Sequence, residues 1–248
     1  MKKAATLHSR ENQIAELTRG ITLPLAPVHY FHLMIIAETL SRAWNDLLTS
    51  QCSAVSSGCE REINALMESR LNHILEEEGT PLSTLVSSVT RGKETISYDG
   101  KILDGRPDIS IQLTGRNRLF PLIVECKIID KRLKKGRELY CKEGVSRFIE
   151  GKYAWATCEA FMLAYVRDGS CIRSSLMPFF NLRHQQEPTQ YLIEAMLEPI
   201  DCSGLDLSRS RHGRNFRYVG QAADIVPGSI DVWHLWVPTP SSDVETPP

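Results

Sequence analysis

The chain lacks the cysteine spacing of a structural zinc site or of a disulfide framework. Its seven cysteines stand at positions 52, 59, 126, 141, 158, 171 and 202, with no CxxC pair and no Cys/His spacing. Zinc sites and disulfide-rich domains depend on such regular spacings. Both are therefore excluded as the basis of this fold, and an odd number of scattered thiols favours a reducing, cytoplasmic compartment.

Long apolar runs and several common enzyme motifs are also missing. The N-terminal residues have no apolar core typical of a signal peptide, and the apolar segment 21–37 is interrupted by two prolines and two histidines. That segment is too short to span a bilayer and predicts a buried helix, so no membrane contact is expected. The chain has no P-loop, Rossmann fingerprint, GxSxG or HExxH motif, which argues against an ATPase, a dehydrogenase, a serine hydrolase and a zinc protease.

What the sequence does contain is a pair of strand-like segments that carry charged residues among apolar ones. The stretch GRPDISIQLTGRNRLFPLIVECKIID, residues 105–130, alternates on both sides of the turn signal at 114–117. In a strand, alternate side chains share a face. Asp108 then shares a face with Ser110 and Gln112, and Glu125 shares one with Lys127, while the intervening apolar residues turn toward a core. Pairing the two strands places Asp108 beside Glu125.

Two carboxylates and an ammonium at one point suit a metal ion and a phosphate. Mg²⁺ and Mn²⁺ prefer carboxylate, carbonyl and water oxygens. Asp108 and Glu125 fit that requirement, and the carbonyl of Cys126 offers a third ligand. Lys127 would then orient or deprotonate the attacking water, or neutralise the charge that develops on the phosphate. The predicted catalytic residues are Asp108, Glu125 and Lys127.

These residues stand at the motif positions of a known superfamily. Pro107-Asp108 followed by Glu125-Cys126-Lys127 resembles the PD-(D/E)xK nucleases, which have the restriction-endonuclease-like fold, and the likeness covers roughly residues 56–170. The resemblance implies an α/β core with a central mixed sheet flanked by helices, and a metal-dependent endonuclease that hydrolyses phosphodiester bonds in DNA. A nucleic-acid-binding scaffold that does not cut, and an RNA-directed nuclease, are the alternatives.

A weaker resemblance concerns the biological setting. The phrases GVSRFIEGKYA and MLAYVRDG, which follow at residues 144–154 and 162–169, are similar to nuclease-like proteins of bacterial anti-phage defence and restriction-type systems. That likeness implies a nuclease or effector subunit with an ATPase- or helicase-type partner, and it leaves room for an oligomer.

The first helix of such a core often supplies a further acidic ligand. The segment 59–79 has an apolar stripe at helical spacing, consisting of Ile63, Leu66, Met67, Leu71 and Ile74. Helical phase places Glu60 on this stripe and Glu62 off its edge, so Glu60 is the first candidate metal ligand and Glu62 the second. Glu60 also fits a capping box that begins at Ser57, and Glu62 fits a solvated surface.

Basic residues predict where nucleic acid would lie. The net charge of −1 is uninformative, but a basic run follows the second strand directly. The predicted contacts are Lys131, Arg132, Lys134 and Lys135 in that run, Arg147 on the next helix, and Arg211 and Arg214 in a C-terminal cluster interleaved with aromatic residues. The alternatives are a solvated loop for the run, an i,i+4 pair with Glu143 for Arg147, and a plain basic surface for the cluster.

The predicted organisation has four parts: an N-terminal helical extension (1–55), the nuclease core (56–175), a C-terminal helix and strand addition (176–238) and a disordered tail (239–248). Helices are predicted over 27–49, 59–79, 138–159 and 190–200, with a Ser/Gly-rich break at 53–58. Strands are predicted over 84–98, 107–113, 120–129, 160–166 and 229–237.

Overall fold

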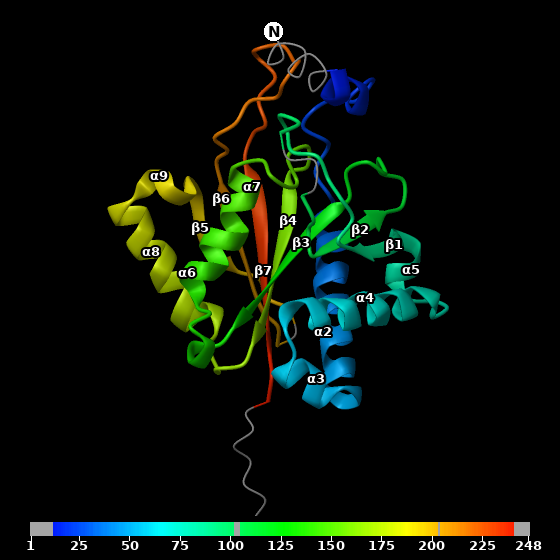
Figure 1. Cartoon of the computed structure of the whole chain (residues 1–248), viewed down its shortest axis with the longest axis vertical. Helices are drawn as coiled ribbons and strands as arrows, with labels where there is room; N and C mark the ends of the chain where they lie inside the picture. The colour runs from blue at the N-terminus through cyan, green and yellow to red at the C-terminus, as the bar shows by residue number, and fades with distance from the viewer. Residues whose placement is uncertain (1–11, 102–104, 203, 241–248) are drawn as a thin grey trace, which may run out of the picture.

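The protein folds around one mixed β-sheet. The computed structural model describes residues 12–101, 105–202 and 204–240. In the order in which they lie in the sheet (Figure 1), the strands are β1 (Val86–Arg91), β2 (Ile109–Leu113), β3 (Leu122–Ile129), β4 (Glu159–Val166), β7 (Ile230–Pro238), β6 (Asp206–His212) and β5 (Ile193–Pro199). Strand β3 pairs in parallel with β4 and β4 in parallel with β7, whereas the remaining neighbours are antiparallel.

Helices cover both faces of this sheet (Figure 1). One layer consists of α2 (Tyr30–Ser50), α3 (Cys52–Ser57), α4 (Glu60–Glu76) and α5 (Pro81–Leu85), and the other of α6 (Arg137–Tyr140), α7 (Ser146–Ile149), α8 (Met177–Gln186) and α9 (Pro188–Tyr191). A π-helical turn, η2 (Cys141–Val145), joins α6 to α7 into one helical segment, residues 137–149, which we call the crossover helix. It supplies the connection that the parallel pair β3 and β4 requires.

The alternation predicted for the two strand-like segments is confirmed by the two cores. Val124, Cys126 and Ile128 of β3 pack in the core beneath α2 and α4, whereas Ile123 and Ile129 pack in the core beneath the crossover helix. Every residue of β3 and of β4 is buried. A central strand covered on both faces offers no solvent to a charged side chain, so Glu125 and Lys127 must find partners within the protein.

Most long elements agree with the sequence pattern. The helices predicted at 27–49 and 59–79 are confirmed as α2 and α4, and the strands predicted at 107–113, 120–129, 160–166 and 229–237 as β2, β3, β4 and β7. All are elements whose apolar periodicity is sustained over several turns or residue pairs, which is the strongest local signal.

Two predictions before β2 are wrong in part. The Ser/Gly-rich break at 53–58 is mostly the short helix α3, which is anchored by the fully buried Val55. The strand predicted over 84–98 is much shorter, since Thr80 caps α5 by accepting the Ser83 amide, and Gly92 at φ +61° follows the last residue of β1. Local side-chain capping therefore outweighs the β-propensity of this stretch.

Of two later predictions, the first is wrong only in its second half and the second is wrong over most of its length. The helix predicted over 138–159 ends at Ile149, because Gly151 adopts φ +68° with the rings of Phe216 and Tyr98 against it. The helix predicted over 190–200 is instead the last turn of α9 followed by strand β5. Leu192, at φ +45°, separates the two, and such a backbone conformation cannot continue an α-helix.

The predicted nuclease core and the predicted C-terminal addition share one sheet. The boundaries expected at 55/56 and 175/176 fall inside α3 and inside the π-helical turn η3 (Ile172–Leu176), and β5 to β7 join the same sheet as β1 to β4. Of the predicted tail, residues 241–248 lie outside the described residues. Within the described ranges, no helix has both the length and the apolar character needed to cross a membrane.

Candidate active site

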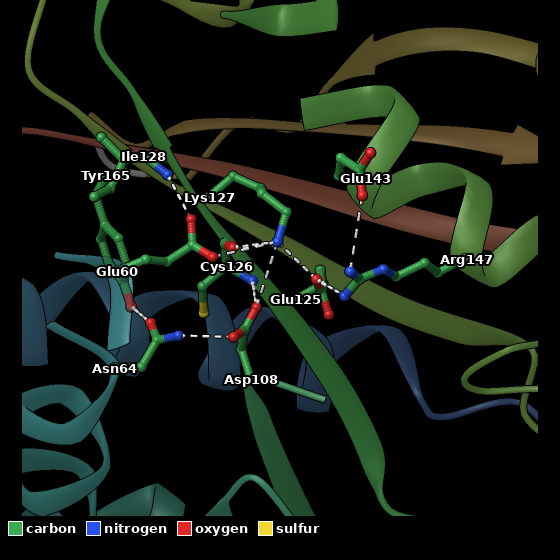
Figure 2. A network of polar contacts seen from close by, with 10 residues as sticks. All are labelled: Glu60, Asn64, Asp108, Glu125, Cys126, Lys127, Ile128, Glu143, Arg147 and Tyr165. Atoms are coloured by element: carbon green, nitrogen blue, oxygen red, sulfur yellow. Dashed lines mark hydrogen bonds and ion pairs between the residues drawn. The ribbon is translucent and has the colours of Figure 1, made fainter. Parts of the chain in front are cut away.

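The site forms where β2 leaves β3 (Figure 2). Pairing between the two strands ends at Ile109 opposite Val124, so β3 continues beyond its neighbour. The backbone groups of the following residues on that edge therefore need other partners. Asp108, directly before β2, meets this need, because its Oδ2 accepts the Cys126 amide at 2.8 Å. The predicted meeting of Asp108 with the Glu125-Cys126-Lys127 segment is confirmed.

Helix α4 completes the same edge with a second carboxylate. Glu60 Oε2 accepts the Ile128 amide at 3.3 Å, two residues further along β3. One turn later, Asn64 donates from Nδ2 to Asp108 Oδ1 at 2.9 Å and accepts the Tyr165 hydroxyl at its own Oδ1, also at 2.9 Å. Asn64 thereby fixes the orientation of Asp108. Hydrogen bonds with residues of β3 and α4 therefore fix the positions of both carboxylates.

The ammonium of Lys127 lies at the point where the oxygens of the site converge (Figure 2). Its Nζ is 2.7 Å from Glu125 Oε1 and 2.8 Å from the Cys126 carbonyl oxygen. It is also 3.4 Å from Glu60 Oε1 and 3.6 Å from Asp108 Oδ2. Three carboxylates and one carbonyl thus surround a single cation, and the Lys127 side chain is only 10% exposed.

The crossover helix supplies a second cation. Arg147 donates from Nη1 to Glu125 Oε1 at 2.5 Å, whereas its Nη2 is 4.0 Å from Glu143. The i,i+4 pair expected as the alternative role of Arg147 is therefore present but is the weaker of its two contacts. Gly144 allows the crossover helix to lie close to β4, since a Cβ at that position would overlap the end of the Met162 side chain. It lies in the π-helical turn, a feature that is frequent at functional sites.

The electrostatics of the site favour a positive charge beside Glu125. Burial, and next the Asp108 carboxylate, raise the pKa of Glu125 to about 8. Burial lowers the pKa of Lys127, but the carboxylates of Glu125, Asp108 and Glu60 together outweigh it and raise that pKa above the ordinary lysine value. Lys127 therefore stays protonated. Glu125 therefore binds a proton far more readily than an ordinary glutamate, and a metal cation could take the place of that proton.

The donor set fits a divalent metal ion such as Mg²⁺ or Mn²⁺. Glu125 has no exposed side-chain surface, and its Oε2 has no hydrogen-bond partner in the described part of the chain. A buried carboxylate oxygen without a partner is costly unless something binds it. Among the described residues, no three His, Cys, Asp or Glu side chains are gathered into a ready cluster, since the Lys127 ammonium stands between these carboxylates. The ligands would be Asp108, Glu125 and the Cys126 carbonyl, with Glu60 beside them.

The other predicted acid, Glu62, has a different role. Its Oε2 accepts the Cys59 amide at 2.7 Å, which makes it the second half of a capping box at the start of α4. The capping box expected from Ser57 to Glu60 is wrong, because α4 begins at Glu60 itself and its N-cap is Cys59. This shift of the N-cap by two residues, from Ser57 to Cys59, frees Glu60 for the site and engages Glu62 in the cap.

The predicted nucleic-acid contacts divide into two groups. Lys131, Arg132, Lys134 and Lys135 form the connector between β3 and the crossover helix, and all are at least partly exposed. In the C-terminal cluster, Arg211 pairs with Asp231 at 2.7 Å, and Arg214 donates to the carbonyls of Trp155 and Thr157. The aromatic residues of that cluster, Phe216 and Tyr218, are each only 6% exposed. The C-terminal cluster is thus engaged in internal contacts.

A separate polar network lies deep in the sheet, under the crossover helix. Its members are His212 of β6, Ser210 and His234, linked in a row by distances of 2.7 Å and 2.8 Å, with the Tyr140 hydroxyl 2.8 Å from the far nitrogen of His234. His212 Nδ1 faces the Tyr191 carbonyl at 2.7 Å and must donate to it. Both histidines are fully buried, so His212 has no access to a substrate.

Asn64 and Tyr165 were missed by the sequence analysis. Asn64 follows Glu60 by four residues and precedes Leu71 by seven, which is the spacing of a buried helix face. A polar residue on that face signals a hydrogen-bonding partner in the core. For Tyr165, on the other hand, nothing in the apolar run of β4 distinguishes it from a packing residue. No protein-family model, curated protein or solved structure matches the chain, so its function must be argued from this geometry.

Proposed function

We propose that the protein is a metal-dependent endonuclease of the PD-(D/E)xK superfamily that hydrolyses phosphodiester bonds in DNA. The observation that carries the proposal is the convergence of Glu125, Asp108, Glu60 and the Cys126 carbonyl on one cation position. Such an oxygen-only donor set suits a hard divalent ion, and a phosphate is the natural further ligand of that ion. The mixed sheet with helices on both faces is compatible with a restriction-endonuclease-like core.

Each side chain would have a defined task in the reaction. A bound Mg²⁺ would act as a Lewis acid that polarises the scissile phosphate. Asp108 and Glu125 would hold the ion, with their positions fixed by the Cys126 amide and by Arg147. Lys127, displaced from the cation position but still tethered to β3, would orient the attacking water and neutralise charge on the phosphate. Because its pKa is raised, Lys127 carries a positive charge in the metal-free protein and does not act there as a general base.

Arg147 reaches the site from the opposite direction to Glu60. Nη1 of its guanidinium is hydrogen-bonded to Glu125, whereas Nη2 is only weakly paired with Glu143. Its side chain is 30% exposed, so it can reach a phosphate without leaving Glu125. Arginine is suited to this because its planar donors can bind two groups at once.

The test is metal-dependent cleavage of supercoiled plasmid DNA by the purified chain. We expect nicking with Mg²⁺ or Mn²⁺ and none in excess EDTA. Cutting that persists in EDTA would contradict the metal mechanism. Cleavage of a single-stranded RNA, compared with a duplex DNA of the same sequence, decides between the DNA-directed and RNA-directed readings.

A scaffold that grips nucleic acid without cutting it is the second candidate. The absence of a carboxylate-only metal cluster in the described part of the chain favours it, because Lys127 must move before an ion can enter. Such a subunit would work beside an ATPase- or helicase-type partner in a bacterial defence or restriction-type system. Nicking by the chain alone rules out the scaffold; nicking that appears only with such a partner places the same active site under the control of that partner.

A further inference from the structure

Two hollows lie end to end along the crossover helix. One, of about 460 Å³, is lined by Lys131, Lys134, Arg137 and Lys142 among others. The other, of about 620 Å³, is lined by Lys142, Arg147 and Lys152 among others. Lys142 lines both, so the two hollows adjoin at its side chain, and we call them together the helix groove. It leads from the basic connector to Arg147, and through Arg147 to Glu125.

The charges that line the helix groove are unevenly balanced. Its carboxylates are engaged, since Glu150 pairs with Lys152 at 2.6 Å, Glu138 with Arg183 at 3.5 Å and Glu143 with Arg147 at 4.0 Å. Asp168, in the first hollow, accepts the backbone amides of Lys131 and Ser170. Lys134 and Lys142, by contrast, form no ion pair with any residue that the structure describes. Unpaired ammonium groups in a concave surface attract an anion.

We propose that the helix groove binds the sugar–phosphate backbone of the strand that is cut, on one side of the scissile phosphate. The inference rests on the proposed function for the identity of its ligand. From Arg137 to Arg147 the helix rises by roughly 15 Å, at about 1.5 Å per residue. At about 3.4 Å per nucleotide along a duplex strand, this length corresponds to about four nucleotides. A polynucleotide is favoured over a single small anion because the positive charges follow one another along a path.

The experiment measures binding of a fluorescein-labelled 20-base-pair DNA duplex without divalent metal, over a series of salt concentrations. The test variant is Lys134→Gln/Lys142→Gln. The matched control, Arg209→Gln/Arg211→Gln, removes the same charge from β6, where both arginines already have carboxylate partners. The slope of log K against log salt is negative for a duplex, and each lost phosphate contact reduces its magnitude by about 0.9. We therefore expect the magnitude of the slope to be smaller by about 1.8 in the test variant and unchanged in the control.

A charge-retaining variant, Lys134→Arg/Lys142→Arg, should bind with the slope of the wild-type protein. Should the double glutamine variant melt at a lower temperature than the wild type, Lys142→Gln alone replaces it, with an expected loss of about 0.9 in slope. A wild-type slope in the glutamine variants overturns the proposal that the helix groove binds the DNA backbone. A wild-type protein that binds no duplex overturns it as well.

Cleavage and binding separate this inference from the proposed function. A wild-type protein that binds duplex with the expected change in slope, but never cuts with Mg²⁺, supports the helix groove and contradicts the nuclease. A protein that cuts, but whose binding is insensitive to Lys134 and Lys142, supports the nuclease and overturns the helix groove.

Discussion

Arg147 Nη1 lies 2.5 Å from Glu125 Oε1, although the two residues are 22 positions apart and belong to opposite ends of a β–helix connection. The contact joins the crossover helix to β3 at Glu125, whose carboxylate is fully buried. Position and charge of Glu125 thus depend on the helix as well as on its own strand.

Arg147→Lys tests this dependence. A lysine keeps the charge but loses the planar donors that reach Glu125 and a phosphate together. We expect cleavage to fall by about 10-fold or more while the melting temperature changes little, since the side chain is partly exposed. Initial rates on plasmid DNA, with thermal melts of both proteins, check this. Unchanged rates would mean that Arg147 has no part in positioning Glu125.

Substitution of the three central residues separates chemistry from binding. Asp108→Ala, Glu125→Ala and Lys127→Ala should each lower cleavage by about 100-fold or more, because each removes a ligand or the charge beside it. Duplex affinity should persist, as the helix groove is untouched. A collapsed melting transition in Lys127→Ala would instead identify Lys127 as a structural ion-pair partner, since it leaves Glu125 with Arg147 alone.

The two glutamates at the start of α4 make a matched pair. Glu60→Gln should reduce cleavage, because Oε1 of Glu60 faces the Lys127 ammonium. Glu62→Gln should leave cleavage unchanged and lower the melting temperature slightly, because Glu62 only caps the helix. Rates and melts of both variants are measured side by side. Equal loss of activity in the two would contradict the assignment of Glu60 to the site.

Protein stability should fall in acid because of the buried histidines. Burial lowers the pKa of His212 to about 4 and that of His234 well below its usual value. Between pH 6.5 and about 4 the unfolded chain therefore binds protons that the folded chain does not. Stability due to this pair is complete above pH 6.5 and is lost as pH falls, by up to about 3 kcal/mol for His212. The free energy of unfolding, measured with denaturant at several pH values, should fall less steeply with decreasing pH in His212→Gln than in the wild type. The same pH dependence in both proteins would contradict the prediction.

Gly151 and Gly169 test the end of the crossover helix. Both have positive φ, but a Cβ on Gly151 would lie 2.7 Å from the rings of Phe216 and Tyr98, whereas one on Gly169 would meet nothing within 4 Å. Gly169→Ala should cost about 1 kcal/mol of unfolding free energy from backbone strain, and Gly151→Ala clearly more. Urea denaturation measures both. Equal costs would show that the rings give way freely.

The strand pair at the site was predictable because its signal is local. Asp108, Glu125 and Lys127 interrupt alternating apolar residues, and alternation fixes the face of each. The hydrogen bonds that link Asp108, Asn64 and Tyr165 could not be predicted. They depend on how α4 lies across β3, a relation that no short stretch of sequence encodes. Likewise, Arg147 gave no local sign that it would reach Glu125, 22 residues away.

Strand β5 shows how a correct pattern leads to a wrong element. Its buried residues, Ile193 and Leu197, are four apart, as on a helix face. Register shifts between Ile193 and Ala195 and between Ala195 and Glu198 interrupt the regular two-residue alternation. The bulges therefore produce the helical spacing of the buried residues. The positive φ of Leu192, which the sequence does not reveal, ends the helix before β5 begins.

Strand β7 is the latest strand in sequence that the structure describes, yet it lies between β4 and β6 in the sheet. Trp44 of α2 stacks on Tyr165 at 5.0 Å and donates its indole N–H to the carbonyl of Pro238, at the end of β7. During synthesis, the edge of β4 and the Trp44 indole N–H both lack their partner until β7 is made, almost 200 residues after Trp44. The sheet therefore acquires one of its inner strands last, and a ribosome-bound fragment ending before β7 would expose the open edge of β4 to other chains.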